Sequence, residues 1–567
     1  MAKIRNLVLL ETKEQVQEFI KTKERYSNAL VISMHFDAEY ELERAGILFK
    51  SSDDYENEET YKNIDEDSIN LANKIIKIIS FKYRNIDIPT IFSWDLTYFC
   101  SFILQRIILI KKIISLEKPN KIIVFDTKQR VKSITVSKYE TLYSSIVPLI
   151  FKNTEINFFE IIDKENKKII VKVADKFQNL LAKYNLFFSK KDKIAFIGAE
   201  NIFKEVISKL PKEYGALRFR DSEGKSSFIS GRYVPFVNLR NFIKYDREEI
   251  KLSEKQVNLL KKLKFKNLAL FEVIEERVRF MVSKYSYYIE LIDVINSFLI
   301  NNNIKLLVLY GDSTTFEKLS VLVARNLKIP SFVIQHGITG HKIGFVPLSA
   351  SYICVYRKES ERFLIKNKIS KKRIVLTGSP RYDSFKPLKS RKTNKILFTP
   401  QVSNRETFFP NYHITLKQRK NMTKIIFNVI KKSKYKLIIS IRPGDKLENL
   451  YHNIAKKLRF KNYEMFYGSN IVDAINNSDI VITPFSTVGI EALLLGKKLI
   501  NITDKKKELV PYSKYKASIT VHNEKELSKA LKTLQAKYYS PDIFLKNYLY
   551  TTSNSTENII NLIKKLI

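Results

Sequence analysis

The sequence contains only two cysteines among its 567 residues, Cys100 and Cys354. They lie far apart and match neither a metal-binding nor a redox spacing, which excludes a disulfide framework and a cysteine-based zinc motif. Such low cysteine usage is typical of a reducing compartment, so we expect a cytoplasmic protein.

Long apolar runs are also missing. The start of the chain has no signal-peptide pattern, because charged residues interrupt it: Lys3, Arg5, Glu11 and Lys13. The most apolar window, 96–116, is interrupted in turn by Gln105, Arg106, Lys111 and Lys112. We therefore expect a buried or peripheral helix there rather than a membrane span. Any membrane contact would be peripheral, through surface attraction at the inner face.

Acidic side chains are outnumbered by basic ones, with 59 Asp and Glu against 99 Lys and Arg, for a net charge of +40. This balance suits an anionic partner: a phosphate-bearing substrate, an anionic glycan or lipid phosphate, or nucleic acid. The alternative is a global bias toward Lys, Ile and Asn. The excess is uneven, because residues 1–67 carry 16 acidic and 9 basic side chains.

Strand-like and helix-like patterns alternate along the whole chain, which predicts α/β units with covered parallel sheets. A chain of this length is expected to hold two or three domains. We divide it into an N-terminal α/β region, a first Rossmann-like domain, a nucleotide-binding Rossmann-like domain and a C-terminal helix that packs back: 1–190, 191–388, 389–540 and 541–567. The acidic segment 51–67 is expected to be an exposed loop.

The stretch 479–496 combines a buried strand with a polar turn and a helix. Free backbone N–H groups and the helix dipole make such a turn an anion site, and the Ser486 and Thr487 hydroxyls add donors. Glu491 lies one turn into the helix, where a carboxylate could bind the hydroxyls of a ribose. The alternative is an ordinary capped helix, because capping needs the same residue types.

Polar and cationic residues follow other predicted strands at their carboxyl ends, where ligands of open α/β sheets bind. These candidates follow the strands 331–335, 373–377, 395–399 and 436–441: His336 and Gly337; Gly378, Ser379 and Arg381; Pro400 and Gln401; Arg442 and Pro443. Their clustering at one edge predicts a shared ligand cleft.

Three of these residues have side chains suited to catalysis or to phosphate binding. His336 could serve as a general base or bind phosphate, and its alternative is a structural histidine. Arg442 could stabilise a departing diphosphate, and its alternative is a salt bridge. Arg381 could do the same or pair locally with Asp383. Asp312 could bind a ligand or simply cap the helix that follows it.

The order of these motifs resembles that of GT-B transferases of bacterial surface polysaccharides, most closely the capsule-polysaccharide and CDP-glycerol glycerophosphotransferase-like group. It is carried by QHG at 335–337, TGSPRYD at 377–383, RP at 442–443 and SDIVITPFSTVGIEAL at 478–493. The chain is also similar, more distantly, to the non-hydrolysing nucleotide-sugar 2-epimerases. The resemblance covers about 300–540.

The resemblance implies two facing Rossmann-like domains, a catalytic or phosphate-contacting role for His336, and diphosphate contacts at Ser486, Thr487 and Gly489. It also implies a ribose contact at Glu491. Arg442 stands where the glycerophosphotransferases usually have histidine, which favours sugar transfer over glycerol-phosphate transfer. No Asp-x-Asp motif follows a strand in 300–540, so neither a metal nor another cofactor is expected.

We therefore predict a metal-independent GT-B glycosyltransferase that moves a sugar from a nucleotide-activated donor to a surface glycan, glycolipid or glycoprotein. Polyol-phosphate transfer and nucleotide-sugar 2-epimerisation are the alternatives among enzymes. A basic nucleic-acid-binding protein and an inactive GT-B module are the alternatives from other classes. No nucleic-acid-binding motif is recognisable, so a specific nucleic-acid partner is not expected.

Overall fold

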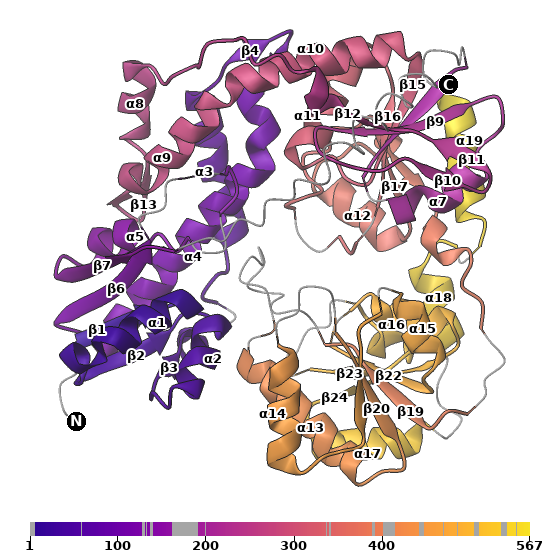
Figure 1. The fold of residues 1–567 in the computed structure, drawn as a ribbon. Coiled ribbons are helices and arrows are strands. Elements are labelled where there is room, and N and C mark those ends of the chain that lie inside the picture. The colour runs from indigo at the N-terminus through magenta and orange to yellow at the C-terminus, as the bar shows by residue number, and fades with distance from the viewer. Residues whose placement is uncertain are drawn as a thin grey trace.

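The computed structural model describes residues 6–57, 59–127, 131, 133–136, 140–161, 191–198, 200–335, 337–339, 342–387, 392–400, 414, 416–441, 447–468, 470–484, 486–503, 510–534, 541–551 and 553–567. Three parallel sheets, each flanked by helices, organise these residues (Figure 1). The predicted α/β class with Rossmann-type domains is confirmed. No described helix is both long and apolar enough to cross a lipid bilayer.

The first sheet has the order β3-β2-β1-β6-β7, and its strands are all parallel. Its strands are β1 Asn6–Leu10, β2 Ala29–Ser33, β3 Lys50–Ser51, β6 Lys121–Thr127 and β7 Thr154–Phe159. Leu7 and Leu9 pack into one hydrophobic cluster while Val8 and Leu10 pack into another, so both faces are covered. The order reverses between β1 and β6, which makes this unit doubly wound in its own right.

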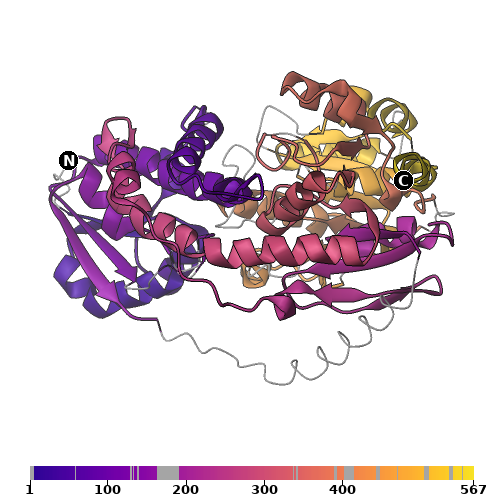
Figure 2. The ribbon, with the colours of Figure 1, turned by 90° about the horizontal axis from the view of Figure 1, so that it is seen from above.

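The helices α1 Lys13–Thr22 and α2 Phe36–Arg44 lie beside this sheet, and α3 Ile64–Ile78 and α4 Ser93–Glu117 extend from it toward the second sheet (Figure 1). The predicted buried helix in 96–116 is α4, most of whose side chains are buried. Three further helices continue this arm: α8 Glu254–Leu260, α9 Phe271–Ser283 and α10 Tyr285–Asn301. Figure 2 shows α10 running from the side of the first sheet to the second. One hydrophobic cluster therefore runs from Leu7 to Ile374.

The prediction of an exposed loop over 51–67 is wrong for much of the segment. It contains the last residue of β3, the 3₁₀ helix η2 Ser52–Tyr55 and the start of α3. Tyr55 and Tyr61 are buried, and the Tyr55 hydroxyl donates to Glu117 of α4 at 2.5 Å. The two aromatic side chains turn the segment inward and leave only part of its carboxylates exposed.

The second sheet has the order β12-β9-β8-β15-β16-β17-β18. Its strands are β8 Lys193–Ile197, β9 Gly215–Arg220, β12 Phe236–Asn238, β15 Ile304–Leu309, β16 Ser331–Ile334, β17 Tyr352–Val355 and β18 Ile374–Leu376. It is accompanied by α7 Glu200–Ser208, α11 Thr315–Asn326, α12 Lys358–Lys366 and the hairpin β10 Ser227–Ile229 and β11 Arg232–Val234.

The third sheet has the order β21-β20-β19-β22-β23-β24, the arrangement of a dinucleotide-binding Rossmann domain. Its strands are β19 Lys395–Phe398, β20 Lys436–Ser440, β21 Tyr463–Phe466, β22 Ile480–Thr483, β23 Lys498–Ile502 and β24 Ile519–Val521. Its helices are α13 Leu416–Lys431, α14 Glu448–Leu458, α15 Ile471–Asn476, α16 Val488–Leu494 and α17 Glu524–Thr533. The order reverses between β19 and β22, which places Pro400 and the turn before α16 at the switch point.

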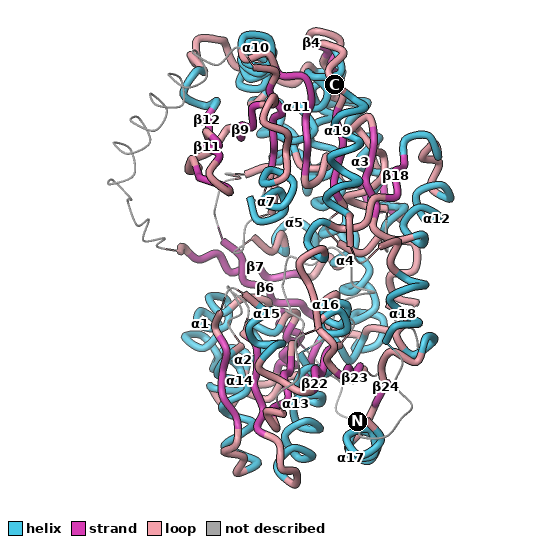
Figure 3. Tube along the Cα trace, turned by 90° about the vertical axis from the view of Figure 1, so that its right-hand side faces the viewer, coloured by secondary structure: helices cyan, strands magenta, loops and turns pink. Residues whose placement is uncertain are grey.

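The end of the chain returns from the third sheet to the second. Helix α18 Pro541–Tyr548 lies between α12 and the third sheet (Figures 1 and 3). Helix α19 Ser555–Leu566 then packs Ile559, Ile560 and Ile563 into the cluster that holds the core of β8 and β15. The Asp383 carboxylate accepts hydrogen bonds from the backbone N–H groups of Ser555 at 3.0 Å and Thr556 at 2.6 Å, so it caps α19.

The first unit also touches the third. Lys417 and Lys420 of α13 pair with Asp54 at 2.7 Å and Glu43 at 2.6 Å. Phe36 packs against the hydrophobic cluster of the third sheet. Ion pairs with the basic helix α13 therefore balance part of the acidic excess of residues 1–67.

The junction of the helical arm with the second sheet buries a titratable carboxyl group. Asp95 in the first turn of α4 is buried and accepts a hydrogen bond from the Thr315 hydroxyl of α11 at 2.6 Å. Burial raises the pKa of Asp95 from 3.8 to about 6. The folded protein therefore holds more protons than the unfolded chain between these values, and its stability falls as the pH rises through that window.

We expect Asp95→Asn to remove this pH dependence. The stability of the variant relative to the natural protein should be about 2 kcal/mol greater near pH 8, where the natural carboxylate is charged and buried, than near pH 4.5. Urea unfolding midpoints of both proteins at the two pH values measure the difference. An equal effect of the substitution at both pH values would show that the Asp95 carboxyl does not change protonation between them.

Candidate functional site

The turn before α16 is the centre of the candidate site. The Ser486 hydroxyl oxygen accepts a hydrogen bond from the Val488 N–H at 3.2 Å, and the Ser486 carbonyl accepts one from the Gly489 N–H at 3.1 Å. Thr487 is the N-cap residue, but its side chain makes no capping bond. Both Ser486 and Thr487 are half-buried. The turn is thus held by backbone hydrogen bonds and carries two partly exposed residues with hydroxyl groups.

Tyr512 supports this turn from beneath. The buried Tyr512 hydroxyl donates to the Ser486 carbonyl at 2.8 Å. A Cβ atom on Gly489 would lie 2.5 Å from the Tyr512 hydroxyl oxygen, so only glycine leaves room for this ring. Gly489 is therefore required for packing, whether or not it also approaches a ligand.

Arg381 and Glu491 join the ends of two sheets. Arg381 lies in η6 Pro380–Tyr382, which follows β18 of the second sheet, and Glu491 lies in α16 of the third. Their side chains form an ion pair with Nη2 and Oε1 2.7 Å apart. The predicted local partner of Arg381, Asp383, instead caps α19. This pair brings together two predicted site residues from different domains.

Three buried tyrosines surround this pair: Tyr356, Tyr382 and Tyr512. Burial raises the pKa of each, and the nearby Glu491 charge adds to the effect. The rings of Tyr356 and Tyr382 meet edge to face with centroids 6.0 Å apart. These phenols stay neutral at ordinary pH and build a rigid floor under the strand ends. Only Tyr382 lies in one of the quoted motifs, TGSPRYD, and the three tyrosines come from separate parts of the sequence.

The backbone that follows β16 is held by a buried polar network. Gln335 donates through Nε2 to the Gly337 carbonyl at 2.6 Å and to the Ser360 hydroxyl at 3.0 Å. Arg357 donates to the same hydroxyl at 2.8 Å, to Thr339, and to the Tyr548 hydroxyl of α18. The predicted site residue Gly337 is thus fixed in place through its carbonyl, with no atom near the place of an added Cβ.

The residues after β18 serve the C-terminal helix. Gly378 has a φ of +83°, and a Cβ atom there would lie 2.3 Å from the Ser555 hydroxyl oxygen. Ser379 is buried, as is Pro400 after β19. These three predicted site residues therefore lie at strand ends without offering an exposed side chain in this structure. The remaining predicted residues lie outside the described ones: His336, Gln401, Arg442 and Pro443.

Asp312 has a structural role that differs from the predicted helix cap. It accepts hydrogen bonds from the backbone N–H groups of Ser349 at 2.5 Å and Ala350 at 2.7 Å, and Thr314 is the N-cap residue of α11. Burial raises the pKa of Asp312. Among the described residues, no group of three or more His, Cys, Asp or Glu side chains is placed to hold a metal ion.

The switch point of the first sheet is filled by the chain itself. The buried Gln15 side chain donates to the Phe125 carbonyl at 2.6 Å and the Thr141 hydroxyl at 3.1 Å, and accepts from the Glu11 N–H at 2.6 Å. This side chain therefore links the ends of β1 and β6. The candidate site residues all follow strands of the second and third sheets.

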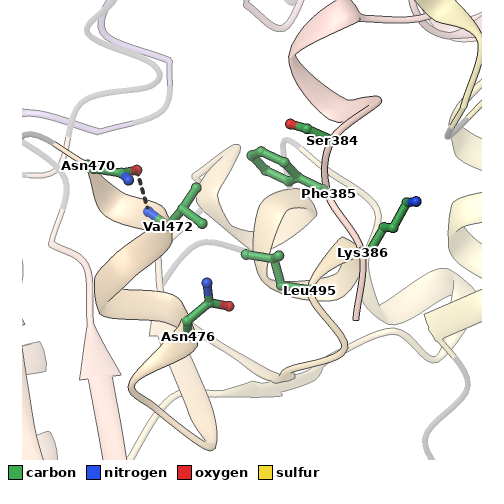
Figure 4. Close-up of a pocket in the computed structure, with 7 residues that line it drawn as sticks. All are labelled: Ser384, Phe385, Lys386, Asn470, Val472, Asn476 and Leu495. Carbon is green, nitrogen blue, oxygen red and sulfur yellow. Dashed lines mark hydrogen bonds between the residues drawn. The ribbon is translucent and has the colours of Figure 1, made fainter. Parts of the chain in front are cut away.

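A pocket of about 390 Å³ lies beside α16, between α15 and the segment that follows η6 (Figure 4). Its lining mixes apolar and polar side chains: Ser384, Phe385, Lys386, Asn470, Val472, Asn476 and Leu495. Asn470 accepts a hydrogen bond from the Val472 N–H at 3.2 Å and so caps α15. The lining has no carboxylate or histidine, so it suits binding rather than acid–base chemistry.

Two doubly wound sheets, joined through residues at their strand ends, define a GT-B-like α/β protein. Residues 282–564, just under half of the chain, match the family model described as UDP-N-acetylglucosamine 2-epimerase. The matched segment runs from α9 to α19 and includes the whole third sheet. The match does not support the capsule-polysaccharide and CDP-glycerol group, which the sequence motifs favour. It supports a similarity to the epimerases, which the sequence analysis places as more distant relatives.

Solved structures similar to the chain include the UDP-GlcNAc 2-epimerase from Methanocaldococcus jannaschii, with 15% identity, a TM-score of 0.43, and alignment over 66% of this chain and 99% of that one. The enzyme from Neisseria meningitidis bound to UDP-GlcNAc has 14% identity, a TM-score of 0.41 and coverage of 66% and 100%. The lipopolysaccharide outer core galactosyltransferase WaaB has 13% identity, a TM-score of 0.37 and coverage of 66% and 100%. A comparison with curated proteins finds no match.

Proposed function

We propose that this protein is an enzyme acting on a nucleotide-activated sugar, and that its reaction is epimerisation at C2 of the sugar. The observation that carries the proposal is the family match over 282–564, which contains both partners of the Arg381–Glu491 pair and the turn at Ser486. The nucleotide diphosphate would lie at Ser486, Thr487 and Arg381, where hydroxyl groups and a guanidinium meet.

Inversion at C2 exchanges the C2 proton for one on the other face of the ring. When a base removes the C2 proton, the electron pair can form a C1–C2 double bond as the nucleoside diphosphate leaves C1. Return of the diphosphate to C1 and of a proton to C2 then restores the sugar, so acid–base groups are needed near the ring. We assign this role to His336, which follows β16. Its neighbours Gln335 and Gly337 are held by the network around Ser360, which fixes the backbone on both sides. Arg442 and the turn at Ser486 would stabilise charge on the diphosphate.

Glycosyl transfer is the second candidate, because residues 6–159 form a separate doubly wound sheet outside the matched segment. Epimerisation of one substrate needs no such unit, whereas transfer needs a place for an acceptor. In that reaction the anomeric carbon would bond to an acceptor hydroxyl, and the nucleoside diphosphate would leave. Asp54 and Glu43 of this unit pair with Lys417 and Lys420 of α13, so an acceptor bound to the unit would lie near the proposed nucleotide-binding domain.

Incubation of the full-length protein with UDP-GlcNAc in D₂O distinguishes the two reactions. Proton NMR should show the C2 epimer with deuterium at C2; a new glycoside with an added glycan acceptor would favour transfer instead. The double variant Ser486→Ala/Thr487→Ala should lose most of the activity, and Thr533→Ala, a hydroxyl at the far end of α17, should not. A folded protein that converts no UDP-, GDP-, CDP- or CMP-activated sugar in either assay would contradict the proposal.

A further inference from the structure

The two side chains of the Arg381–Glu491 pair differ sharply in exposure. The Arg381 side chain is 51% exposed, whereas the Glu491 side chain is 1% exposed. The partner that a ligand can touch is therefore the arginine. The carboxylate lies behind it, within the floor formed by Tyr356, Tyr382 and Tyr512.

This burial conflicts with a ribose contact at Glu491. A carboxylate binds a ribose through two hydroxyl groups, and these must approach its oxygen atoms directly. Oε1 of Glu491 already faces the Arg381 guanidinium at 2.7 Å, and the residue has almost no surface of its own. A ribose would have to displace Arg381 and leave a charged carboxylate in a buried site without its cation, which is costly.

We infer that Arg381 contacts the diphosphate of the nucleotide and that Glu491 is a positioning residue that holds the guanidinium at the domain boundary. This inference rests on the proposed function and refines it, because it replaces the ribose contact with a role in phosphate binding. The guanidinium has five N–H donors in a planar fork. One face can bind the carboxylate while the other binds phosphate oxygens.

The position of the pair supports this role. Arg381 follows the last strand of the second sheet, and Glu491 lies one turn beyond the N-cap Thr487 of the third. Burial raises the pKa of Tyr310, which follows β15, and the Arg381 charge partly offsets this rise, so that charge reaches the strand ends of the second sheet. One buried carboxylate thus places a cation from one domain beside the turn of the other.

Calorimetric titrations of the full-length protein with UDP, 2′,3′-dideoxy-UDP and uridine test this arrangement. Arg381→Ala and Glu491→Gln should each weaken UDP binding about tenfold to a hundredfold, the usual range for a lost charged hydrogen bond. Dideoxy-UDP should lose the same factor, and uridine affinity should stay within about twofold. The double variant should bind UDP no more weakly than Arg381→Ala alone, because both changes remove one interaction.

Arg279→Ala is the matched control, because Arg279 is 49% exposed and pairs with Glu275 in α9. It should leave UDP affinity unchanged. If Glu491→Gln does not fold, Arg381→Lys keeps the charge, loses the fork and should still weaken UDP binding.

A Glu491→Gln loss that vanishes with dideoxy-UDP would overturn the inference in favour of a ribose contact. Unchanged UDP affinity in Arg381→Ala would overturn it while leaving nucleotide binding intact. A folded natural protein that binds none of UDP, CDP and GDP would remove the proposed function, and the inference with it.

Discussion

Replacement of Arg357 by methionine is expected to destabilise the protein by about 3 kcal/mol or more, because each buried acceptor that loses its charged donor costs about 1–3 kcal/mol. Arg357 is buried and donates hydrogen bonds from all three of its nitrogen atoms. Methionine fills a similar volume but donates nothing. The Ser360 hydroxyl, the Thr339 side chain and the Tyr548 hydroxyl would each lose a charged donor in a place that water does not reach.

The expected damage is local as well as global. Tyr548 ends α18, and Thr339 belongs to the segment after β16. Helix α18 and the segment 337–339 should therefore unfold locally before the second sheet does. Urea unfolding gives the change in stability, and hydrogen exchange shows whether α18 and 337–339 lose protection first.

Arg362→Met provides the comparison, because Arg362 is exposed on α12, the helix for which Arg357 is the N-cap residue. That change should alter stability by no more than about 0.5 kcal/mol. Equal unfolding midpoints for the two variants would show that the network around Arg357 is not needed to join α18 to the second sheet.

The strands of the second and third sheets could be predicted because their sequences are continuous apolar runs bounded by polar turns. The run at 479–484 is β22, and the run at 436–441 is β20. Both lie in sheets covered on two faces, where alternation of polar and apolar residues is not required. The order of strands follows from pairing between distant segments. The doubly wound first sheet, where β1 pairs with β6, could therefore not be predicted from local pattern.

The position of the candidate site residues at strand ends could be predicted, and their contacts less so. The rule that ligands bind at the carboxyl ends of parallel strands led to Arg381 and to the turn at Ser486. It could not show that Arg381 pairs with Glu491, because the two residues are distant in sequence while Asp383 is near. A local ion pair was the natural expectation, and the folded chain uses Asp383 to cap α19 instead.

The packing role of Gly489 illustrates the same limit. A glycine at the start of a helix after a strand is typical of phosphate-binding turns, and that role remains a prediction. The structure adds a second reason for glycine, the Tyr512 ring that occupies the space of a side chain. Sequence position alone does not distinguish a glycine that admits a ligand from one that admits a neighbouring aromatic ring.

Gly378→Ala is expected to have the other large effect, a loss of about 3 kcal/mol in the free energy of unfolding. Two terms contribute. The backbone of Gly378 has a φ of +83°, where a side chain costs about 1–2 kcal/mol. The added Cβ would also lie 2.3 Å from the Ser555 hydroxyl oxygen and 2.5 Å from Thr551 Cγ2, and such overpacking costs about 1–3 kcal/mol. Relief of the clash would move the start of α19 away from β18.

Gly231→Ala separates the two terms, because Gly231 has a φ of +76° and no atom within 4 Å of an added Cβ. It should lose only the backbone term, about 1–2 kcal/mol. Adding Thr551→Ser and Ser555→Ala to Gly378→Ala removes the two nearest atoms and should recover part of the loss, although Asp383 still caps the helix. Urea unfolding midpoints of four proteins measure each step: the natural protein, Gly378→Ala, Gly231→Ala and the triple variant. Equal losses at Gly378 and Gly231, with no recovery in the triple variant, would mean that α19 does not depend on close packing against Gly378.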